Sequence, residues 1–588
     1  MGIQTKHFVN APSDLVIESL QGLCTLNPHL GIDEASKVVY LTEQDKSNVA
    51  IICGGGSGHE PAHAGFVGEG MLTAAVCGHI FASPSPAQVR RGIELTDNNA
   101  GNYTGDVLNF GLAKEQFAAT YPGKAGQVKF LNVGDDVAVG KTQGSIVGRR
   151  GLAGVILVYK IAGALARSGA SLDEVHRVAE YVSKRLATIG VGLDHCHVPG
   201  TAGGESHLQP NEIEIGMGIH NEPGTKRLSP VPSLHDLVQQ LLGMLLSQSD
   251  PERSFLPVTG RSDEVVLLVN NLGGVSELEL GAIVREVAAG LSTRQVTVQR
   301  VISGTFMTSL NMPGFSITLL LLPSAADTDA PAPDLILHLI DAPTSAPGWK
   351  WSSGAPVSDL TSPRNPKSST AAAGSAKGPT IRAENPSAFD AAVKRACAAV
   401  NEESSEITRM DTIAGDGDCG LTLQTGVNAV LEQMQVGNVS GSDVIGSLIA
   451  ISEIAGVKMG GTSGALYSFV HALYTDSACA SDIVTPSVWA KALSSALENL
   501  YTYTRARPPS RTLVDPLDAF VRTLSAVPDD VRSAVERAAS AAEHTREIDA
   551  KAGRSAYVES DVLKRERVPD PGAWGVKVIL EALIARSA

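Results

Sequence analysis

The sequence predicts an α/β domain at residues 1–342, a linker at 343–386 and an all-α domain at 387–588. Three observations indicate this division. Before the linker, short β-branched runs end in glycine loops and alternate with helical patterns. After it, strand-like runs nearly vanish and helical segments, some of them rich in Ala, take their place. The segment between is rich in Ser, Pro, Ala, Gly and Thr.

In the first domain, the apolar runs at 49–52 and 265–269 lead into glycine loops. Helical patterns lie between such runs, for example at 153–167 and 171–189. Because open α/β sheets bind ligands on the loops at their strand ends, we expect the functional residues of this domain there.

The linker cannot bury enough apolar area to offset the entropy lost on ordering, so we expect it to be flexible. The second domain has helical spacing at 391–400, 442–454 and 531–552. These segments predict helices with no sheet between them.

Composition bounds the function. The net charge of -15 argues against a broad nucleic-acid surface, although metal ions can still offset charge at a phosphate site. The seven cysteines are scattered and form no CxxC pair, which indicates reduced thiols. No apolar run approaches the ~20 residues that span a bilayer, and Met1–Asn10 lacks the apolar core of a signal peptide. We therefore expect a cytoplasmic protein without nucleic-acid or membrane partners.

The first candidate site is the loop Gly54–Pro61, which directly follows a predicted strand. Its glycines let backbone amides approach a ligand closely. His59 within it could move protons near neutral pH. The alternative is a tight strand-to-helix turn that contains an incidental histidine.

The second candidate site is Asp411–Gly420, with three carboxylates within eight residues around glycine turns. Carboxylate oxygens suit a hard cation such as Mg²⁺. An EF-hand needs a Glu at the twelfth position of its loop, where counting from Asp416 reaches Val427. The alternative is a solvated Asp-Gly turn. Downstream, Gly460–Gly464 could contact phosphate or form a turn between helices.

Two further patterns are weaker. Gly134–Thr142 resembles a P-loop, but five residues separate its glycines where the motif requires four, and two acids would repel phosphate. Asp194–His197 could suggest zinc, but no second ligand cluster follows at suitable spacing. We therefore predict structural roles for both.

Several separate motifs resemble those of one family. They are Gly54–Ala64, Asn102–Asp106, Gly216–Gly224, Asn270–Gly274, Gly304–Met307, Asp411–Gly420, Met459–Leu466, Arg511-Thr512 and Asp570–Gly572. Over nearly its whole length, the chain resembles the single-chain, ATP-dependent dihydroxyacetone kinases (glycerone kinases), in their fungal-type two-domain form. The resemblance implies two α/β subdomains that hold a triose, a helical barrel that holds Mg-ATP, and a homodimer.

The resemblance also implies roles for individual residues. His220 would attack the carbonyl of dihydroxyacetone or glyceraldehyde and hold it as a hemiaminal, while His59 and Asp106 would form an acid/base pair. The expected triose-binding residues are Gly56, Ser57, Gly58, His59, Glu60 and Asp106. The expected Mg²⁺ ligands are Asp411, Asp416 and Asp418. The expected nucleotide-binding residues are Asp416, Gly417, Asp418, Cys419, Gly420, Thr462, Ser463, Arg511, Thr512, Asp570, Pro571 and Gly572.

The chain departs from the family pattern just before Asn102. Family members carry an apolar strand ending in lysine there, whereas here a helix-like segment, 87–95, reaches the motif and Gly101 replaces the lysine. Loss of a central strand would displace Asp106. Three hypotheses stand: an active kinase, a lyase that splits FAD into AMP and cyclic FMN, and an impaired homologue that keeps ligand contacts as a binding or regulatory protein but has lost turnover. The gap is equally compatible with a mispredicted reading of an active enzyme.

Overall fold

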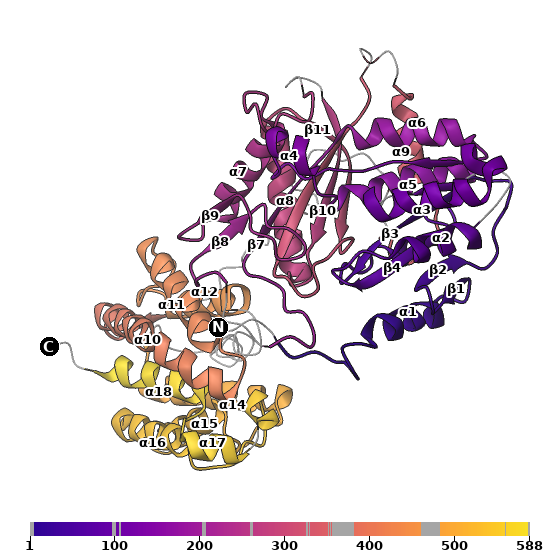
Figure 1. Cartoon of the computed structure of the whole chain (residues 1–588). Coiled ribbons are helices and arrows are strands. Elements are labelled where there is room, and N and C mark those ends of the chain that lie inside the picture. The colour runs from indigo at the N-terminus through magenta and orange to yellow at the C-terminus, as the bar shows by residue number, and fades with distance from the viewer. Residues whose placement is uncertain are drawn as a thin grey trace. The chain divides into compact units, whose positions relative to one another are not determined.

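The computed structural model describes most of the chain (Figure 1). The described residues are 5–96, 102–104, 107–202, 207–258, 263–324, 327, 330–350, 352, 354, 381–459, 483–558 and 560–585. The chain divides into two compact units, Met1–Lys367 and Ser368–Ala588, here called the first and second units.

The first unit contains two six-stranded sheets, in agreement with the predicted α/β fold. Sheet one has the order β1-β2-β4-β3-β5-β6, with β4, β3, β5 and β6 parallel to one another. Its elements and the helices around it are α1 (Leu15–Leu26), β1 (Leu30–Asp33), β2 (Val38–Leu41), β3 (Ala50–Ser57), β4 (Ala74–Ile80), α2 (Pro86–Leu95), β5 (Asn102–Thr104), α3 (Val107–Thr120) and β6 (Val128–Phe130).

Sheet two has the order β11-β10-β12-β7-β8-β9 and is mostly antiparallel, with only β10 and β11 parallel. Its strands are β7 (Leu186–Gly192), β8 (Ile213–Ile215), β9 (Lys226–Leu228), β10 (Glu264–Asn271), β11 (Thr297–Gly304) and β12 (Gly314–Leu321). The remaining helices of the unit are α4 (Lys141–Val147), α5 (Gly154–Arg167), α6 (Leu172–Ser183), α7 (Leu234–Leu246), α8 (Glu277–Thr293) and α9 (Pro333–Asp341).

One prediction in this region is wrong. The helical pattern assigned to 171–189 is two elements, because α6 ends at Ser183 and β7 begins at Leu186. All seven residues of β7 are buried. A strand covered on both faces reads as a continuous apolar run, which periodicity does not distinguish from a buried helix.

A short strand occupies the place where a strand was expected to be missing. The motif residues Asn102–Thr104 themselves form β5, which pairs with β3 on one side and β6 on the other. Its pairing with β3 covers only Ala50 and Ile51. Sheet one therefore stays continuous across this position, through a strand of three residues.

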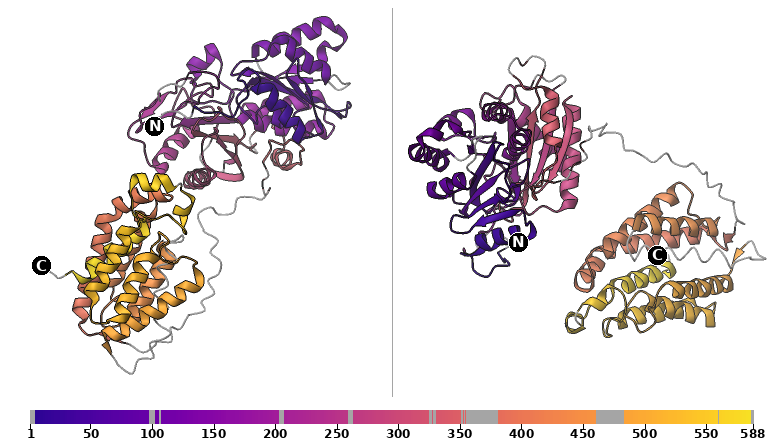
Figure 2. Two further views of the ribbon diagram at one scale, coloured as in Figure 1. Left: turned by 90° about the horizontal axis from the view of Figure 1, so that it is seen from below. Right: turned by 90° about the vertical axis from the view of Figure 1, so that its right-hand side faces the viewer.

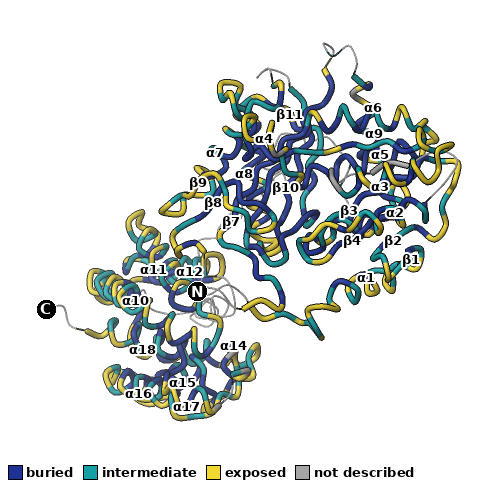
Figure 3. The backbone as a smooth tube through the Cα atoms, in the orientation of Figure 1, coloured by how far each residue is buried: buried dark blue, intermediate teal, exposed yellow. Residues whose placement is uncertain are grey.

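Helix α5 lies in a core shared by both sheets. Every residue of α5 except Arg167 is buried, as expected of a helix that is apolar on all sides. The same hydrophobic cluster contains Cys53 of β3 and Leu268 of β10. Figure 3 shows the strands of the first unit as mostly buried segments with exposed residues around them.

The end of the first unit differs from the predicted linker boundary at residue 343. Residues 344–349, here called the strap, pack on the unit: the amide of Gly348 donates to the carbonyl of Gly65 at 2.7 Å. Ala346 is buried in the shared core, and the ring of Trp349 lies 5.9 Å from that of Phe306. Two large apolar contacts within a Ser/Pro-rich segment hold the strap in place.

The second unit is almost entirely helical (Figure 2). Contacts link α12, α11, α10, α18, α16, α15 and α14 as successive neighbours. Its helices are α10 (Pro386–Ala414), α11 (Cys419–Gln435), α12 (Val444–Ile454), α14 (Pro486–Tyr503), α15 (Val514–Ala526), α16 (Val531–His544), α17 (Ser560–Glu566) and α18 (Pro571–Ile584). The described strands are only β13 (Arg382–Ala383) and β14 (Ile483–Val484), which form one parallel pair. Among the described helices of the chain, none is long and apolar enough to cross a membrane.

The burial of α5 gives a stability prediction. Replacing Ile156, which is fully buried in α5, with Ala should lower the free energy of unfolding of the first unit by about 2–5 kcal/mol, because a cavity remains. The matched change Ile146→Ala on α4, where the side chain is 82% exposed, should change it by less than about 0.5 kcal/mol. Urea unfolding of the full chain, followed by the fluorescence of its tryptophans, measures both. Equal effects would contradict the assignment of α5 to the core.

Candidate active site

The main candidate site is a cavity of about 350 Å³ in the first unit. It is lined by Gly54, Gly55 and Gly56 at the end of β3, by His59 and by Phe81 after β4. The loop between β8 and β9 adds Ile219, His220 and Glu222. Val155, Val158 and Tyr159 of α5 close one wall. Both sheets thus contribute to one cavity beside the shared helix.

His59 is buried and its orientation is determined by its neighbours. Its Nδ1 lies 2.8 Å from the carbonyl oxygen of Thr308. A carbonyl can only accept, so Nδ1 carries the proton and Nε2 is the atom free to react. The ring of Phe81 stacks on it at 5.2 Å. His59 is therefore held with Nε2 directed toward His220, 3.0 Å from its Nε2.

His220 is held in a similar way by a carboxylate. Its Nδ1 lies 3.0 Å from Oε1 of Glu222, and its amide donates to Oε2 at 2.8 Å. Glu222 accepts both bonds, so Nδ1 of His220 carries a proton and Nε2 remains the reactive atom. The side chain is 41% exposed and accessible to a small ligand.

The contact between the two Nε2 atoms requires one proton. Each ring already donates from Nδ1, so two neutral rings would bring two lone pairs together at 3.0 Å. A single shared proton makes the contact favourable, and Glu222 balances its charge. The pair is a preformed unit of two imidazoles, one proton and one carboxylate.

Burial disfavours a positive charge on His59. Burial lowers the pKa of His59 to about 4, with a smaller contribution in the same direction from nearby His220. Burial acts to raise the pKa of Glu222, but the hydrogen bonds from His220 outweigh it and bring the pKa to about 2. Glu222 is ionised throughout the physiological range.

The glycine loop after β3 divides into lining and supporting residues. Gly56 and His59 line the cavity. Ser57 is buried and donates to the carbonyl of Gly78 at 3.0 Å. Gly58 has a φ of +101°, and its amide donates to the carboxylate of Glu60. Ser57, Gly58 and Glu60 thus shape the loop and are not among the residues that line the cavity.

Sequence reasoning did not assign roles to Phe81, Thr308 and Glu222. The motif Gly216–Gly224 contains Glu222, and its position two residues after His220 in a glycine-bounded turn was the available signal. Phe81 and Thr308 are far from His59 in sequence and carried no signal. Asp106, expected to act with His59, lies outside the described residues.

The acidic cluster of the second unit forms as predicted. Asp411 comes from α10, and Asp416 and Asp418 come from the loop before α11; carboxylate oxygens of all three lie within 4.8 Å of one another. Asp411 is buried and accepts from the amides of Asp418 and Cys419 at 2.9 Å. This all-oxygen donor set fits Mg²⁺.

The other residues expected to bind the nucleotide lie outside the acidic cluster or at its border. Arg511 is fully buried, with one bond to the carbonyl of Val568 at 2.8 Å. Thr512 donates its amide to Asp515. Asp570 caps α18 through the amide of Ala573, and burial raises its pKa to about 6. Gly417 and Gly420 border the acidic cluster, and Pro571 and Gly572 begin α18. Thr462 and Ser463 lie outside the described residues.

The P-loop-like segment is structural, as predicted. The buried carboxylate of Asp135 accepts from the amides of Leu152 and Gly154 at 2.6 and 2.9 Å. Asp136, also buried, pairs with Arg150 at 2.6 Å. Both acids are engaged in holding the backbone, so the segment is not arranged to receive phosphate.

Comparison with known proteins matches both units. A Dak1 domain matches residues 21–348, and a DAK2 domain matches residues 413–585. The chain belongs to the dihydroxyacetone kinase family. A dihydroxyacetone kinase of Pichia angusta is 40% identical to it, over 98% of each chain. The Dak1 match ends within the strap.

Two further members of the dihydroxyacetone kinase family bear on the site. The triokinase/FMN cyclase of Homo sapiens is 36% identical, over 99% of each chain. The crystal structure of the dihydroxyacetone kinase from C. freundii in complex with AMP-PNP and Mg²⁺ is 29% identical. It covers 98% of this chain and 99% of its own, with a TM-score of 0.61.

The buried histidines of this family member predict a pH dependence of stability. Burial lowers the pKa of His59 to about 4 and that of His63 to about 3, from 6.5 when unfolded. As pH falls below 6.5, the unfolded chain therefore binds protons that the folded chain does not. Stability should fall by about 1.4 kcal/mol per pH unit for each histidine down to about pH 4. Glu222 contributes only below about pH 4.5, where its stabilisation is lost toward pH 2.

Urea unfolding at pH 7 and pH 5 measures this slope. The variant His63→Gln, which removes one of the two groups, should reduce it. A slope that is the same in both proteins would contradict the assignment to buried, neutral histidines.

Proposed function

We propose that the chain transfers the terminal phosphate of ATP to dihydroxyacetone, with glyceraldehyde as a second acceptor. One observation carries the proposal: Glu222 holds His220 so that Nε2 lies at the cavity beside His59. This arrangement supplies a nucleophile and a proton to a carbonyl compound. Family membership supports the same activity.

The proposed step keeps charge and atoms in balance. The carbonyl inserts between the two rings, and the shared proton passes from Nε2 of His59 to the carbonyl oxygen, which leaves the lone pair on Nε2 of His220. Nε2 of His220 then forms the bond to the carbonyl carbon. The product is a neutral hemiaminal hydroxyl and a positively charged imidazole ring, and Glu222 compensates that charge as before. His59 ends neutral, which its low pKa favours.

The covalent bond also provides selectivity. Dihydroxyacetone has few atoms with which to bind, so a bond to His220 would fix one end and present a hydroxyl for reaction. Glycerol lacks a carbonyl carbon and could not be held in this way. We therefore propose that short-chain ketoses and aldoses are preferred over polyols.

For the second unit, we propose that Asp411, Asp416 and Asp418 hold Mg²⁺ with the phosphates of ATP. Their clustered oxygens support this role, as does the AMP-PNP and Mg²⁺ complex of the related kinase. Bound Mg²⁺ would neutralise charge on the transferred phosphate. Arg511 and Asp570 are buried, and Cys419 of α11 and Trp574 of α18 belong to one hydrophobic cluster.

A second candidate activity is cleavage of FAD to AMP and cyclic FMN. The name of the Homo sapiens relative, triokinase/FMN cyclase, favours it. The reaction would use the acidic cluster and would not use the His220 cavity. A variant of His220 can therefore distinguish the two activities in an experiment.

The kinase proposal is tested by following ADP release from Mg-ATP with and without dihydroxyacetone. We expect substrate-dependent release that falls by at least about 100-fold in His220→Ala, because the substrate is no longer fixed. Absence of release from folded protein would contradict an active kinase and support the impaired-homologue hypothesis, with the short β5 as the first cause to examine.

Glu222→Ala tests the positioning role of the carboxylate. We expect kcat/KM to fall by about 10–100-fold, the usual size for a group that orients a reactive residue. In a His220→Ala background the same change should have no further effect, since Glu222 acts through His220. Additive losses would show that Glu222 acts separately.

The lyase proposal is tested with FAD and Mn²⁺, by measuring AMP and cyclic FMN. Asp411→Asn should remove both this activity and the kinase activity, whereas His220→Ala should remove only the kinase activity. Loss of cyclic FMN in His220→Ala would contradict a shared nucleotide site with separate acceptor sites.

A further inference from the structure

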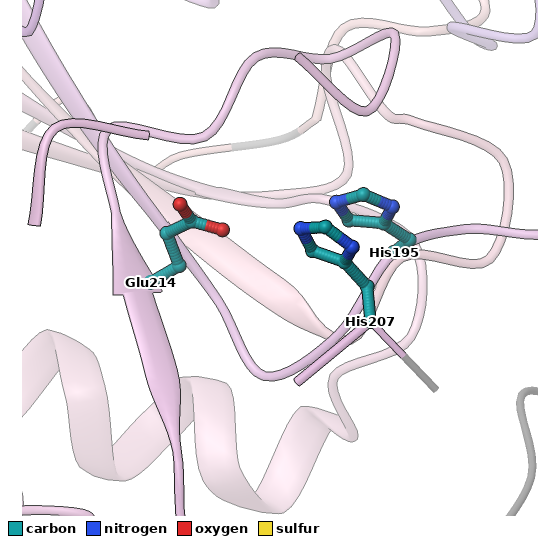
Figure 4. A group of neighbouring side chains, drawn as sticks. All are labelled: His195, His207 and Glu214. Carbon is teal, nitrogen blue, oxygen red and sulfur yellow. The ribbon is translucent and has the colours of Figure 1, made fainter. Parts of the chain in front are cut away.

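A second group of potential metal ligands lies in the first unit, outside the cavity residues. His195, His207 and Glu214 each direct a ligand atom into one space, and these atoms lie within 4.8 Å of one another (Figure 4). His195 lies after β7, and Glu214 lies on β8. In the sequence, no second ligand cluster follows Asp194–His197 at a spacing suitable for zinc. In the fold, His207 and Glu214 lie beside His195 and supply the missing ligands.

One polar atom of Glu214 and one of His195 lack a hydrogen bond among the described residues. Glu214 is 3% exposed, and its Oε2 is buried without a hydrogen bond. Nε2 of His195 is buried without one as well. A buried carboxylate oxygen and a buried ring nitrogen that lack partners each carry a desolvation cost. One cation between them would satisfy both.

The backbone holds the two histidines together. Oδ1 of Asp194 accepts the amide of His195 at 2.8 Å and the amide of His207 at 3.2 Å. The two rings stack at 4.0 Å with an interplanar angle of 17°. Figure 4 shows a nitrogen of each ring on the side of the Glu214 carboxylate. The arrangement thus does not depend on chance rotamers of isolated surface histidines.

The guanidinium group of Arg227 already places a positive charge at this position. Nη2 of Arg227 lies 2.6 Å from Nε2 of His207, and its Nε lies 3.5 Å from Oε1 of Glu214. Oε1 also accepts the amide of Gly224 at 3.1 Å. Arg227 is directly opposite Glu214 across β8 and β9. Its side chain is 45% exposed, so it can move into solvent without unfolding the hairpin.

We propose that His195, His207 and Glu214 form a Zn²⁺ site, and that Arg227 occupies it when the metal is absent. Two imidazoles and one carboxylate are a ligand set that Zn²⁺ accepts, with a water in the fourth position. Tetrahedral bonds of about 2.0 Å require ligand atoms about 3.3 Å apart. The ligand atoms must therefore approach by up to about 1.5 Å, and the exposed His207 can supply this movement.

Metal bound there would brace the loop that carries His220. β8 and β9 form a hairpin whose connecting loop, 216–225, contains His220. Zn²⁺ would tie β8 at Glu214 to the segment of His195 and His207. It would also release Arg227 from its contacts at the base of the hairpin.

The test uses the full chain without a histidine tag, in excess MgCl₂ so that the acidic cluster is occupied. Zn²⁺ binding is measured by isothermal titration calorimetry. We expect one site that weakens by at least about 10–100-fold in His207→Gln and in His195→Gln, since direct ligands matter at least as much as the groups around them. His207 is exposed, so its replacement should not affect folding.

Two further variants sharpen the result. Arg227→Gln should bind Zn²⁺ about fivefold more tightly, the effect of removing one partly screened repulsive charge. The control His235→Gln, at an exposed histidine paired with Glu286, should bind as the parent protein does. Unchanged affinity in both ligand variants would overturn the proposal.

Crystals soaked in Zn²⁺ locate the metal independently. We expect an anomalous peak between His195, His207 and Glu214. A peak only between His7 and His197, whose ring nitrogens lie 2.8 Å apart, or only between His59 and His220, would overturn the assignment.

Discussion

The first unit depends on the complete burial of α5 between two sheets. Along β10, Val265, Leu267 and Val269 pack into the core on the side of α7 and α8, while Val266 and Leu268 pack into the core that contains α5. On sheet one, Ile51 and Cys53 of β3 face that same core. The period-two alternation of each sheet thus gives it one private core and one shared core. On its shared face, each sheet packs into a core that contains α5.

The cavity follows from this arrangement. His59 comes from the end of β3 in sheet one, while His220 and Thr308 come from sheet two. Backbone hydrogen bonds join the two loops directly, because the amide of Thr308 donates to the carbonyl of His59 at 3.1 Å, and Tyr159 of α5 lies in the cavity wall. Its hydroxyl contacts Nδ1 of His63 at 2.8 Å and Sγ of Cys53 at 2.7 Å. The same helix therefore both supports the core and lines the cavity.

Local features were predictable from the sequence, and contacts between distant segments were not. The run at 49–52 correctly placed a strand, although β3 continues through the glycines to Ser57, and the spacing of Asp411, Asp416 and Asp418 was short enough for turns to bring them together. By contrast, β7 carries no alternation because both its faces are buried. The hydrogen-bond partners of Nδ1 in the two histidines also differ in their distance along the chain. Glu222 is two residues from His220, but Thr308 is 249 residues from His59. The start of the linker predicted from composition was also too early. Ala346 and Trp349 pack on the first unit, although the residues around them are rich in Ser and Pro.

The position of the strap affects how the protein is made. α5 ends at Arg167, but the last part of its surroundings, Trp349, follows about 180 residues later. At about 5–20 residues per second, a ribosome takes roughly 10–40 seconds to add them. During that interval the strands of sheet two are added, from β7 to β12, and the strap comes last. The packing around α5 is therefore complete only after the strap has been synthesised.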